Sequence, residues 1–381
     1  MKRNGIIRRL LAVLTAGSFI CTVPEPVLAA EQAVSGEDCS GTDANLPRGW
    51  LLWHSYSRYD AKDSRLYLRD PEGKIQEIGG EFIHAMNGSF GSSPERITFM
   101  AIDSAADEWD IFLYDGGSVT NLTQNSGCRN EDPKWSPDGR QIMFKTGKWD
   151  ASADDFVYQL ALLNPESKTV TMLTDDSREE AMPCFSADGS FLYYTAYTDR
   201  IGAIMQMNLL TGETKTVFAE DGVNAYYPVV SGEKLYFTKW CSADNHCDQL
   251  MCYDGQTVTA LPFNSERFDC SDACPVSSSE MIYSCTAEGV YDLYYYDGNC
   301  ACRIPECSSG QNDLGASFFA ERTGDVSADG AFDAADVRLL QKWMLAVSGT
   351  ELNNWEAGDF YADGKLDAVD FSLMKRALLH S

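Results

Sequence analysis

The sequence predicts an all-β six-bladed β-propeller over residues 46–320, followed by a small all-α domain over residues 323–381 that holds two loop-helix motifs. Two observations support this division. A unit of four short apolar segments recurs every 43 to 50 residues through the first region. Near the C-terminus, one spacing of aspartates occurs twice, 34 residues apart.

The composition fits a folded protein and argues against two classes of partner. Of the 381 residues, 44% are hydrophobic and 12% aromatic, which is enough to build a core. There are 57 acidic and 30 basic side chains, and the formal net charge is −27. Phosphate groups are bound by clustered lysines and arginines, so this charge argues against nucleic acid and against anionic lipid surfaces.

The N-terminus has the pattern of a secretory signal. It begins with four basic residues: Lys2, Arg3, Arg8 and Arg9. An apolar stretch follows over residues 10–23, and Val27 and Ala29 are suited to signal-peptidase cleavage. We therefore expect residues 1–29 to be a signal peptide and the protein to be secreted. The apolar stretch is short for a membrane span, and no later stretch reaches about 18 apolar residues, so no span is expected.

The cysteines agree with export. Thirteen are present, twelve of them beyond the predicted signal, and nine lie between Cys241 and Cys307. An even number in an exported chain predicts disulfides, which would staple the final third of the propeller. Free buried thiols are the alternative, and they would suit an organism that lives without oxygen. A zinc site at Cys300, Cys302 and Cys307 is disfavoured, because no paired C-x-x-C motif is present.

The repeat is clearest in two units that share a Ser-x-Asp-Gly turn. Asp138-Gly139 and Asp188-Gly189 each separate two extended segments, and glycine permits the positive φ that such a hairpin needs. The second segment of each unit carries an aromatic anchor. The six anchors are Trp53, Phe99, Phe144, Tyr194, Phe237 and Tyr283. Another hairpin follows each anchor, so a unit has four short strands, as a propeller blade does.

Strand exchange is expected to close the ring. The first unit starts at its second strand, residues 49–55, and a single extended segment, residues 314–320, follows the sixth unit. That segment would complete the first blade and remove exposed sheet edges. The Trp-Ser-Pro-Asp-Gly turn at residues 135–139 resembles the repeat of TolB-like propellers, relatives of the WD-type propellers. The resemblance implies a scaffold that binds proteins or glycans, cleaves pectic oligosaccharides or caps peptidases, so it does not decide the function.

Two C-terminal loops have the oxygen-rich pattern of a calcium site. The template D-x-x-x-D-G-x-x-D-x-x-D supplies carboxylates at positions 1, 5, 9 and 12 and a backbone carbonyl at position 7. The first loop contains Asp325, Ser327, Asp329, Ala331, Asp333 and Asp336. The second contains Asp359, Asp363, Lys365, Asp367 and Asp370. We expect two Ca²⁺ ions, with weaker binding in the second loop, because Tyr361 is a poor ligand where the first loop has Ser327.

An amphipathic helix is predicted after each loop. Apolar residues at helical spacing are Val337, Leu340 and Met344 in the first, and Phe371, Met374 and Leu378 in the second. No matching helix precedes either loop, so the motifs are EF-hand-like rather than full EF-hands. Loop-helix, linker, loop-helix over about 60 residues resembles a type I dockerin. The resemblance implies Ca²⁺ binding and attachment to a cohesin domain of a scaffoldin, in the extracellular cellulosome of anaerobic plant-wall degraders.

The resemblance also implies which residues would contact the cohesin. In dockerins, loop positions 10 and 11 and helix positions 17 and 18 do so. These positions hold Ala334, Ala335, Gln341 and Lys342 in the first copy and Ala368, Val369, Lys375 and Arg376 in the second. A solvated helix end, favoured by the helix dipole, is the alternative interpretation of the two basic residues in the second copy.

The residues that lead into the innermost strands of a propeller surround the mouth of its central channel. Candidates for ligand binding there are Arg129, Glu131, Arg178, Glu180, Tyr226, Tyr227 and Asp272. Aromatic rings beside carboxylates suit sugars, and carboxylates can also serve as acid and base in glycoside cleavage. The alternative is that these residues only solvate the rim.

The sequence leaves the propeller's activity open. G-x-S-x-G and H-E-x-x-H motifs are absent. His54 and His84 weakly suggest a shared metal. Three functions remain: binding of plant-cell-wall polysaccharide or of a protein partner, a polysaccharide lyase or glycoside hydrolase with its site in the channel, and a structural or regulatory cellulosome subunit. We favour the first and keep the enzyme as the alternative.

Overall fold

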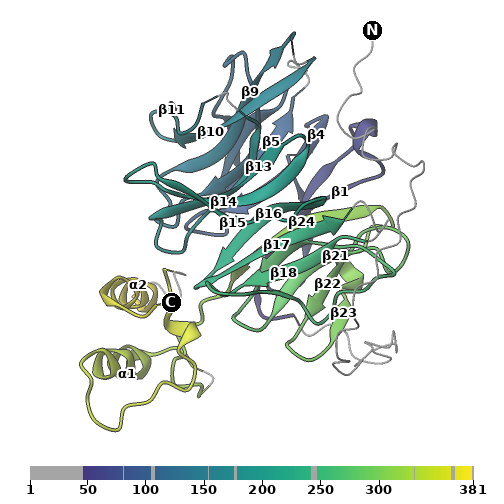
Figure 1. The fold of residues 1–381 in the computed structure, drawn as a ribbon. Coiled ribbons are helices and arrows are strands. Elements are labelled where there is room, and N and C mark those ends of the chain that lie inside the picture. The colour runs from purple at the N-terminus through teal and green to yellow at the C-terminus, as the bar shows by residue number, and fades with distance from the viewer. Residues whose placement is uncertain are drawn as a thin grey trace.

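The computed structural model describes residues 46–379, except for 80, 104–107, 153, 176–177, 242–246, 330 and 362–364. The predicted signal peptide and Asp363 lie outside these residues. The strands form six four-stranded antiparallel sheets, and the two long helices follow at the C-terminal end (Figure 1). The sheets are the six predicted blades, so the expected fold class is confirmed.

The first three blades have the following strands, in order from the innermost outward. Blade one contains β24 (Asn312–Ala320), β1 (Gly49–Tyr56), β2 (Arg65–Arg69) and β3 (Ile75–Ile78). Blade two contains β4 (His84–Phe90), β5 (Arg96–Ile102), β6 (Asp110–Asp115) and β7 (Ser118–Asn121). Blade three contains β8 (Arg129–Trp135), β9 (Ile142–Asp150), β10 (Asp155–Asn164) and β11 (Thr169–Met172).

The remaining blades repeat this order. Blade four contains β12 (Glu180–Phe185), β13 (Phe191–Thr198), β14 (Ile201–Asn208) and β15 (Thr214–Phe218). Blade five contains β16 (Val223–Ser231), β17 (Lys234–Cys241), β18 (Gln249–Tyr253) and β19 (Val258–Ala260). Blade six contains β20 (Cys270–Pro275), β21 (Met281–Cys285), β22 (Asp292–Tyr296) and β23 (Ala301–Arg303). Short 3-10 helices lie at η1 (Tyr59–Ala61) and η2 (Pro305–Cys307).

Strand exchange closes the ring as predicted. β24, the last strand of the chain, pairs antiparallel with β1, the first, and Gly49 lies opposite Ala320. Neighbouring innermost strands contact one another all the way round, including β20 with β24 and β24 with β4. The exchange therefore joins the two ends of the propeller chain within one sheet.

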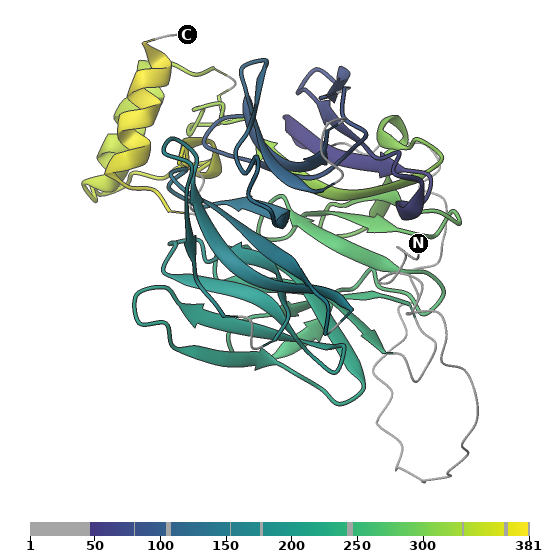
Figure 2. The same ribbon diagram turned by 90° about the horizontal axis from the view of Figure 1, so that it is seen from above.

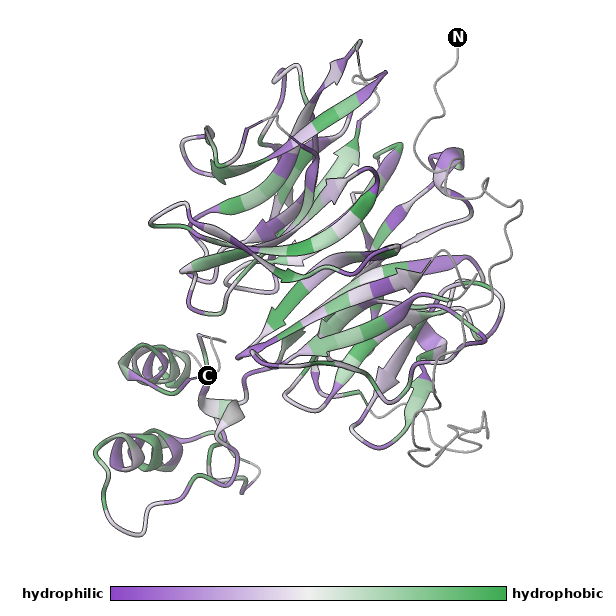
Figure 3. Cartoon of the chain, viewed as in Figure 1, coloured by the Kyte–Doolittle hydropathy of each residue, from purple (hydrophilic) through white to green (hydrophobic). Residues whose placement is uncertain are grey.

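Apolar packing between neighbouring blades holds the ring together. Six buried clusters occur, one at each interface between blades, and one of them joins blade six to blade one through Leu51, Trp53 and Ile282. All six predicted anchors are buried, from 0% exposed at Phe99, Tyr194 and Phe237 to 3% at Trp53. Apolar and polar residues are interspersed along the strands, as expected where sheet faces pack on each other (Figure 3).

The C-terminal region contains helix α1 (Ala334–Met344), the short helix η3 (Glu356–Gly358) and helix α2 (Ala368–Leu378), and α1 and α2 contact each other. Figure 2 shows the two helices together, outside the blades. Their shared core contains Val326, Leu340 and Met374, each 0% exposed. Among the described residues, none of the helices is long and apolar enough to cross a membrane.

The cysteines differ from the sequence prediction. In the structure, eight of the described cysteines carry free thiols: Cys128, Cys184, Cys247, Cys252, Cys270, Cys274, Cys285 and Cys307. Blades five and six are therefore not stapled by bonds among these eight. The interblade apolar clusters stabilise this part of the ring instead, and Cys252, Cys270 and Cys285 pack within one of them.

Candidate functional site at the propeller axis

A β-bulge in each innermost strand forms a ring of six residues around the axis. Each bulge contains one residue with φ between 53° and 65°. The six are Asn87, Asp132, Met182, Tyr227, Asp272 and Gly315, which we call the bulge ring. Gly, Asn and Asp tolerate this conformation, whereas Met182 and Tyr227 adopt it at an energetic cost.

Members of the bulge ring contact one another and Lys134 of strand β8. Asn87 donates to Asp132 at 2.7 Å, and the Gly315 amide donates to Asp272 at 3.0 Å. The ammonium of Lys134, on blade three, lies 5.8 Å from the ring centre of Tyr227, on blade five. These two blades are not neighbours, so this contact crosses the axis. The bulge ring therefore brings side chains of several blades together at the axis.

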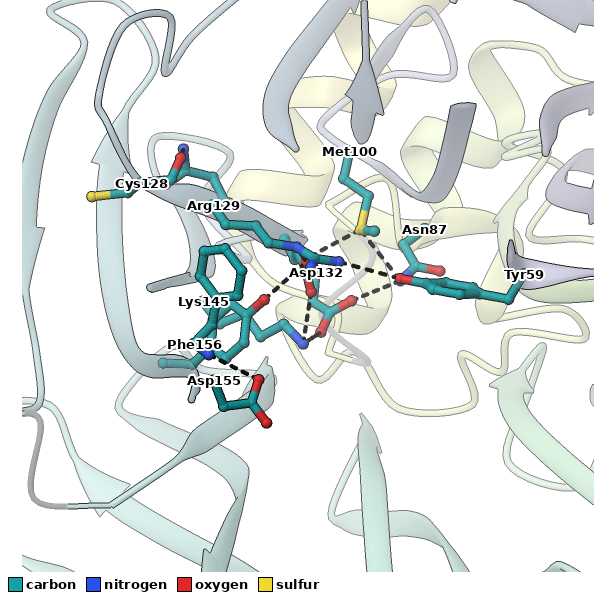
Figure 4. Close-up of polar contacts among 12 residues, drawn as sticks. Tyr59, Asn87, Met100, Cys128, Arg129, Asp132, Lys145, Asp155 and Phe156 are labelled. Atoms are coloured by element: carbon teal, nitrogen blue, oxygen red, sulfur yellow. Dashed lines mark hydrogen bonds and ion pairs between the residues drawn. The ribbon is translucent and has the colours of Figure 1, made fainter. Parts of the chain in front are cut away.

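A buried ion-pair network lies beside the bulge ring, in blade three (Figure 4). Its members are Arg129, Glu131, Asp132, Lys145 and Tyr158, which we call the axial cluster. Lys145 lies 2.9 Å from Glu131 and 3.2 Å from Asp132, and Arg129 forms an ion pair with Glu131. The Tyr158 hydroxyl donates to Glu131 at 3.1 Å. The β8 and β9 register positions Glu131 directly opposite Lys145, which brings these charges together.

Lys145 and Glu131 of the axial cluster are ionised although they are buried. Burial lowers the pKa of Lys145, but the carboxylates of Asp132 and Glu131 outweigh this and raise the pKa well above its usual value. Burial raises the pKa of Glu131, but Lys145 and Arg129 outweigh it and lower the pKa. Each cation is therefore neutralised by a carboxylate of the same cluster.

Acidic residues gather on the opposite side of the axis. Asp248, Asp269 and Asp272, which we call the acidic arc, come from blades five and six. Asp269 accepts the Asp248 amide at 2.8 Å, and Tyr291 donates to Asp248 at 3.4 Å. Burial raises the pKa of Asp248 to about 7, assisted by the charges of Asp269 and Asp272 and opposed by hydrogen bonds from Tyr226 and Tyr291. Among the described residues, none of the three aspartates forms an ion pair.

Tyrosines surround the charged groups. Seven of the described tyrosines, from blades one, three, four, five and six, approach the axis: Tyr56, Tyr59, Tyr158, Tyr197, Tyr226, Tyr227 and Tyr291. Burial raises the pKa of each, and a carboxylate of the axial cluster or the acidic arc raises it further. All seven therefore stay protonated near neutral pH and can donate hydrogen bonds. The Arg129 guanidinium reaches across to Tyr59 at 3.5 Å (Figure 4).

The sequence-predicted channel residues fall into two groups. Arg129 and Glu131 belong to the axial cluster, Tyr227 and Asp272 to the bulge ring, and Tyr226 bonds to the acidic arc. Arg178 and Glu180 differ. They pair with each other at 3.0 Å, and Arg178 donates at 3.3 Å to Tyr194, which lies inside the blade core.

Several residues of the site were not found from the sequence. Lys145 and Tyr158 come from the second and third strands of blade three, and Tyr59 comes from η1. The sequence prediction covered only the residues that enter the innermost strands. A proline follows the bulge residue in three blades, at Pro133, Pro183 and Pro228. Because proline cannot donate to a sheet, these positions are the available sequence signal for the bulges.

The two predicted histidines lie near each other in the interior. His54 accepts the Asn87 amide at 3.4 Å, and His84 bonds to Ser64. Burial lowers the pKa of His54 to about 3 and that of His84 to about 4. Within the described part of the chain, no three His, Cys, Asp or Glu side chains are placed to hold a metal ion.

The two C-terminal loops repeat one hydrogen-bond pattern. In the first, Asp336 is 1% exposed and accepts the amides of Ser327 and Asp333 at 3.1 and 3.0 Å. In the second, Asp370 accepts the amides of Tyr361 and Asp367 at 2.8 and 3.0 Å. Asp333 and Asp367 cap helices α1 and α2, each in a capping box. The carboxylate of loop position 12 is thus fixed at the inside of each loop, which suits an oxygen-ligated cation.

Residues 323–379 match the family of the dockerin type I domain. This segment is a type I dockerin. The dockerin implies binding of calcium and of a cohesin of the cellulosome type. All eight residues expected to contact the cohesin are exposed: Ala334, Ala335, Gln341, Lys342, Ala368, Val369, Lys375 and Arg376. The Lys375 ammonium lies 5.2 Å from the ring centre of Phe371.

The propeller that precedes the dockerin is similar to solved structures at low identity. TolB from Acinetobacter baumannii is 15% identical with a TM-score of 0.58, over 72% of this chain and 67% of that one. Hydrazine synthase of Kuenenia stuttgartiensis is 12% identical with a TM-score of 0.61, over 72% of this chain and 46% of that one. These likenesses show the fold alone. No curated protein matches the chain.

Proposed function

We propose that the protein is a secreted cellulosome component that binds an uncharged plant-cell-wall polysaccharide. The dockerin would attach it to a scaffoldin cohesin, and the axis of the propeller would hold the glycan. The observation that carries the glycan proposal is the convergence of seven tyrosines with the axial cluster and the acidic arc. Aromatic faces with a few fixed hydrogen-bonding groups are the usual composition of sugar sites.

Each dockerin loop would hold one Ca²⁺. In the first loop, Asp325, Asp329, Asp333 and Asp336 would supply carboxylate oxygens, Ser327 a hydroxyl and Ala331 a backbone carbonyl. In the second loop, carboxylate oxygens would come from Asp359, Asp363, Asp367 and Asp370, and a backbone carbonyl would come from Lys365. Oxygen donors of this kind suit a hard cation. A bound ion would tie each loop to the start of its helix, so the cohesin surface would depend on calcium.

The charges at the axis favour an uncharged glycan over a polyuronate. Arg129 and Lys145 are each paired with a carboxylate of the axial cluster, and Lys134, the further cation at the axis, lies against the ring of Tyr227. The three aspartates of the acidic arc have no ion-pair partner among the described residues. A uronate chain would add further negative charge to this surface, and like charges placed together cost binding energy. The tyrosine hydroxyls and the carboxylates can instead bond to neutral sugar hydroxyls.

One observation favours a second function, glycoside hydrolysis. Burial and its acidic neighbours raise the pKa of Asp248 to about 7, so its carboxyl can carry a proton near neutral pH. A general acid in glycoside cleavage needs this property, together with a second carboxylate that stays ionised. Asp269 and Asp272 lie beside it.

One experiment tests both functions. The full-length protein, with Ca²⁺, is incubated with a neutral hemicellulose, with pectin and with cellulose, and two quantities are followed: its depletion from solution and new reducing or unsaturated ends. We expect depletion by hemicellulose and none by pectin. New ends that disappear in Asp248→Asn would establish the hydrolase. No depletion and no new ends with any polysaccharide would refute the glycan proposal and leave the dockerin as the assigned activity.

A further inference from the structure

Two buried cysteines face each other across neighbouring strands of blade six. Cys270, on β20, lies directly opposite Cys285, on β21. The next pair along, Asp269 and Thr286, is the hydrogen-bonded one, because the Thr286 amide donates to Asp269 at 3.1 Å. Cys270 and Cys285 therefore occupy a non-hydrogen-bonded pair, in which opposed Cα atoms lie about 4.5 Å apart. A disulfide accepts Cα separations from about 4.4 to 6.8 Å.

The two side chains also lie in one apolar cluster and are shielded from solvent. Cys270 is 0% and Cys285 is 1% exposed. The thiol of Cys270 donates to the Phe263 carbonyl at 4.0 Å, and the neighbouring Cys270 side chain lowers the pKa of Cys285. Cys252 packs in the same apolar cluster, but its partners across the strands are Tyr236 and Thr259, so it has no cysteine opposite.

We propose that Cys270 and Cys285 are a redox site that closes into a cross-strand disulfide when the secreted protein meets a low-molecular-weight disulfide. The Cys285 thiolate attacks one sulfur of that disulfide, forms a mixed disulfide and releases one small thiol. Cys270 then attacks the Cys285 sulfur and releases the second small thiol. Two protein thiols are oxidised, the small disulfide is reduced to two thiols, and both protein protons end on those thiols.

The position of the pair connects it to the axis. Cys270 lies between Asp269 and Asp272, two members of the acidic arc, at the start of the innermost strand. The bond would tie this strand to β21 just before its bulge. Because both sulfurs are buried, exchange requires opening between β20 and β21, so oxidation is expected to be slow in the folded protein and faster during refolding.

Peptide mapping tests the pairing directly. The full-length protein is reduced, refolded in a glutathione redox buffer, alkylated and digested, and linked peptides are identified by mass. We expect a peptide joining Cys270 to Cys285, with a loss of two hydrogens that reduction restores. Recovery of both as alkylated thiols, or linkage of either one mainly to another cysteine, would overturn the proposal.

Thermal unfolding tests the consequence. We expect a higher unfolding midpoint for the oxidised wild-type protein than for the reduced one, because the bond shortens the reach of the unfolded chain. The difference should vanish in Cys285→Ser and persist in Cys252→Ser, a matched variant in the same cluster. A midpoint difference of equal size in Cys285→Ser would overturn the proposal. The mapping on wild-type protein decides the matter even where a variant fails to fold.

Discussion

The propeller and the dockerin both arise from internal repetition, but they repeat different properties. The two dockerin loops repeat chemistry: Asp336 and Asp370 occupy the same position and accept the same two backbone amides. The six blades repeat geometry: every innermost strand has a bulge with positive φ, yet the residue there changes from blade to blade. Repeated chemistry identifies a ligand, whereas repeated geometry provides a frame on which each blade can place a different group.

The largest expected effect is the loss of cohesin binding by the dockerin, with the propeller left intact. Removing Ca²⁺ with a chelator, or replacing Asp336 by Ala, should weaken cohesin binding by on the order of 100-fold, about 2.7 kcal/mol. The reason is that metal binding and loop folding are coupled. Titration calorimetry with a cohesin measures the loss, and the propeller's unfolding transition serves as the internal control. Undiminished cohesin binding in chelator would contradict the calcium assignment.

The second largest effect is expected when the axial cluster loses its central carboxylate. Glu131→Ala leaves Arg129 and Lys145 buried without their shared carboxylate, and we expect a loss of about 3–5 kcal/mol of stability. Urea unfolding measures it. Arg140→Ala is the control, because Arg140 is 84% exposed and lies 3.9 Å from Asp138, and we expect a change within about 0.5 kcal/mol. Equal losses in the two variants would show that burial of the cluster contributes nothing.

The pH dependence of stability is expected to differ between Asp248, in the acidic arc, and Asp188, in an exposed turn of blade four. The pKa of Asp248 rises from 3.8 to about 7 on folding, so between these values the folded state holds a proton that the unfolded state has lost. Stability should therefore fall as pH rises through this window, by up to about 1.4 kcal/mol per pH unit.

Asp248→Asn should remove that slope, as measured by urea unfolding from pH 4 to pH 7. The control is Asp188→Asn. Hydrogen bonds from Ser186 and Ser190 lower the pKa of Asp188 to about 2, so its contribution is present above 3.8 and is lost as the pH falls. The Asp188 variant should therefore keep the slope. An unchanged slope in Asp248→Asn would refute the raised pKa.

The smallest expected effect is a difference in Ca²⁺ affinity between the two dockerin loops. Tyr361→Asp restores a carboxylate at position 3 of the second loop, and we expect Ca²⁺ binding there to tighten by about tenfold, about 1.4 kcal/mol. Ser327→Asp in the first loop is the matched change and should gain less, because a hydroxyl already stands there. Calorimetry resolves the two sites. A second loop that binds more tightly than the first in the wild-type protein would contradict this ranking.

The same distinction explains what the sequence could predict. The six anchors and the closing strand follow from apolar spacing, which packing between blades enforces, and the dockerin loops follow from aspartates at fixed positions. The axial site depends on register and on bulges, which bring Lys145 opposite Glu131 and Asn87 to Asp132. The first contact depends on the register of two adjacent strands in blade three, and the second joins blade two to blade three. Spacing within one unit reveals neither of them. Arg178 and Glu180 have suitable chemistry at a similar place in their blade but bond to Tyr194.

The most direct test of the central claim is titration calorimetry of the full-length protein, in Ca²⁺, with a neutral hemicellulose oligosaccharide and with an oligogalacturonate. The account predicts binding of the neutral chain only, weakened about tenfold in Tyr226→Phe, which loses a hydrogen bond at the acidic arc. Tyr253→Phe, whose hydroxyl bonds to Gly255 on an outer strand, should bind normally. Binding of the oligogalacturonate alone, or equal binding by wild type and Tyr226→Phe, would contradict it.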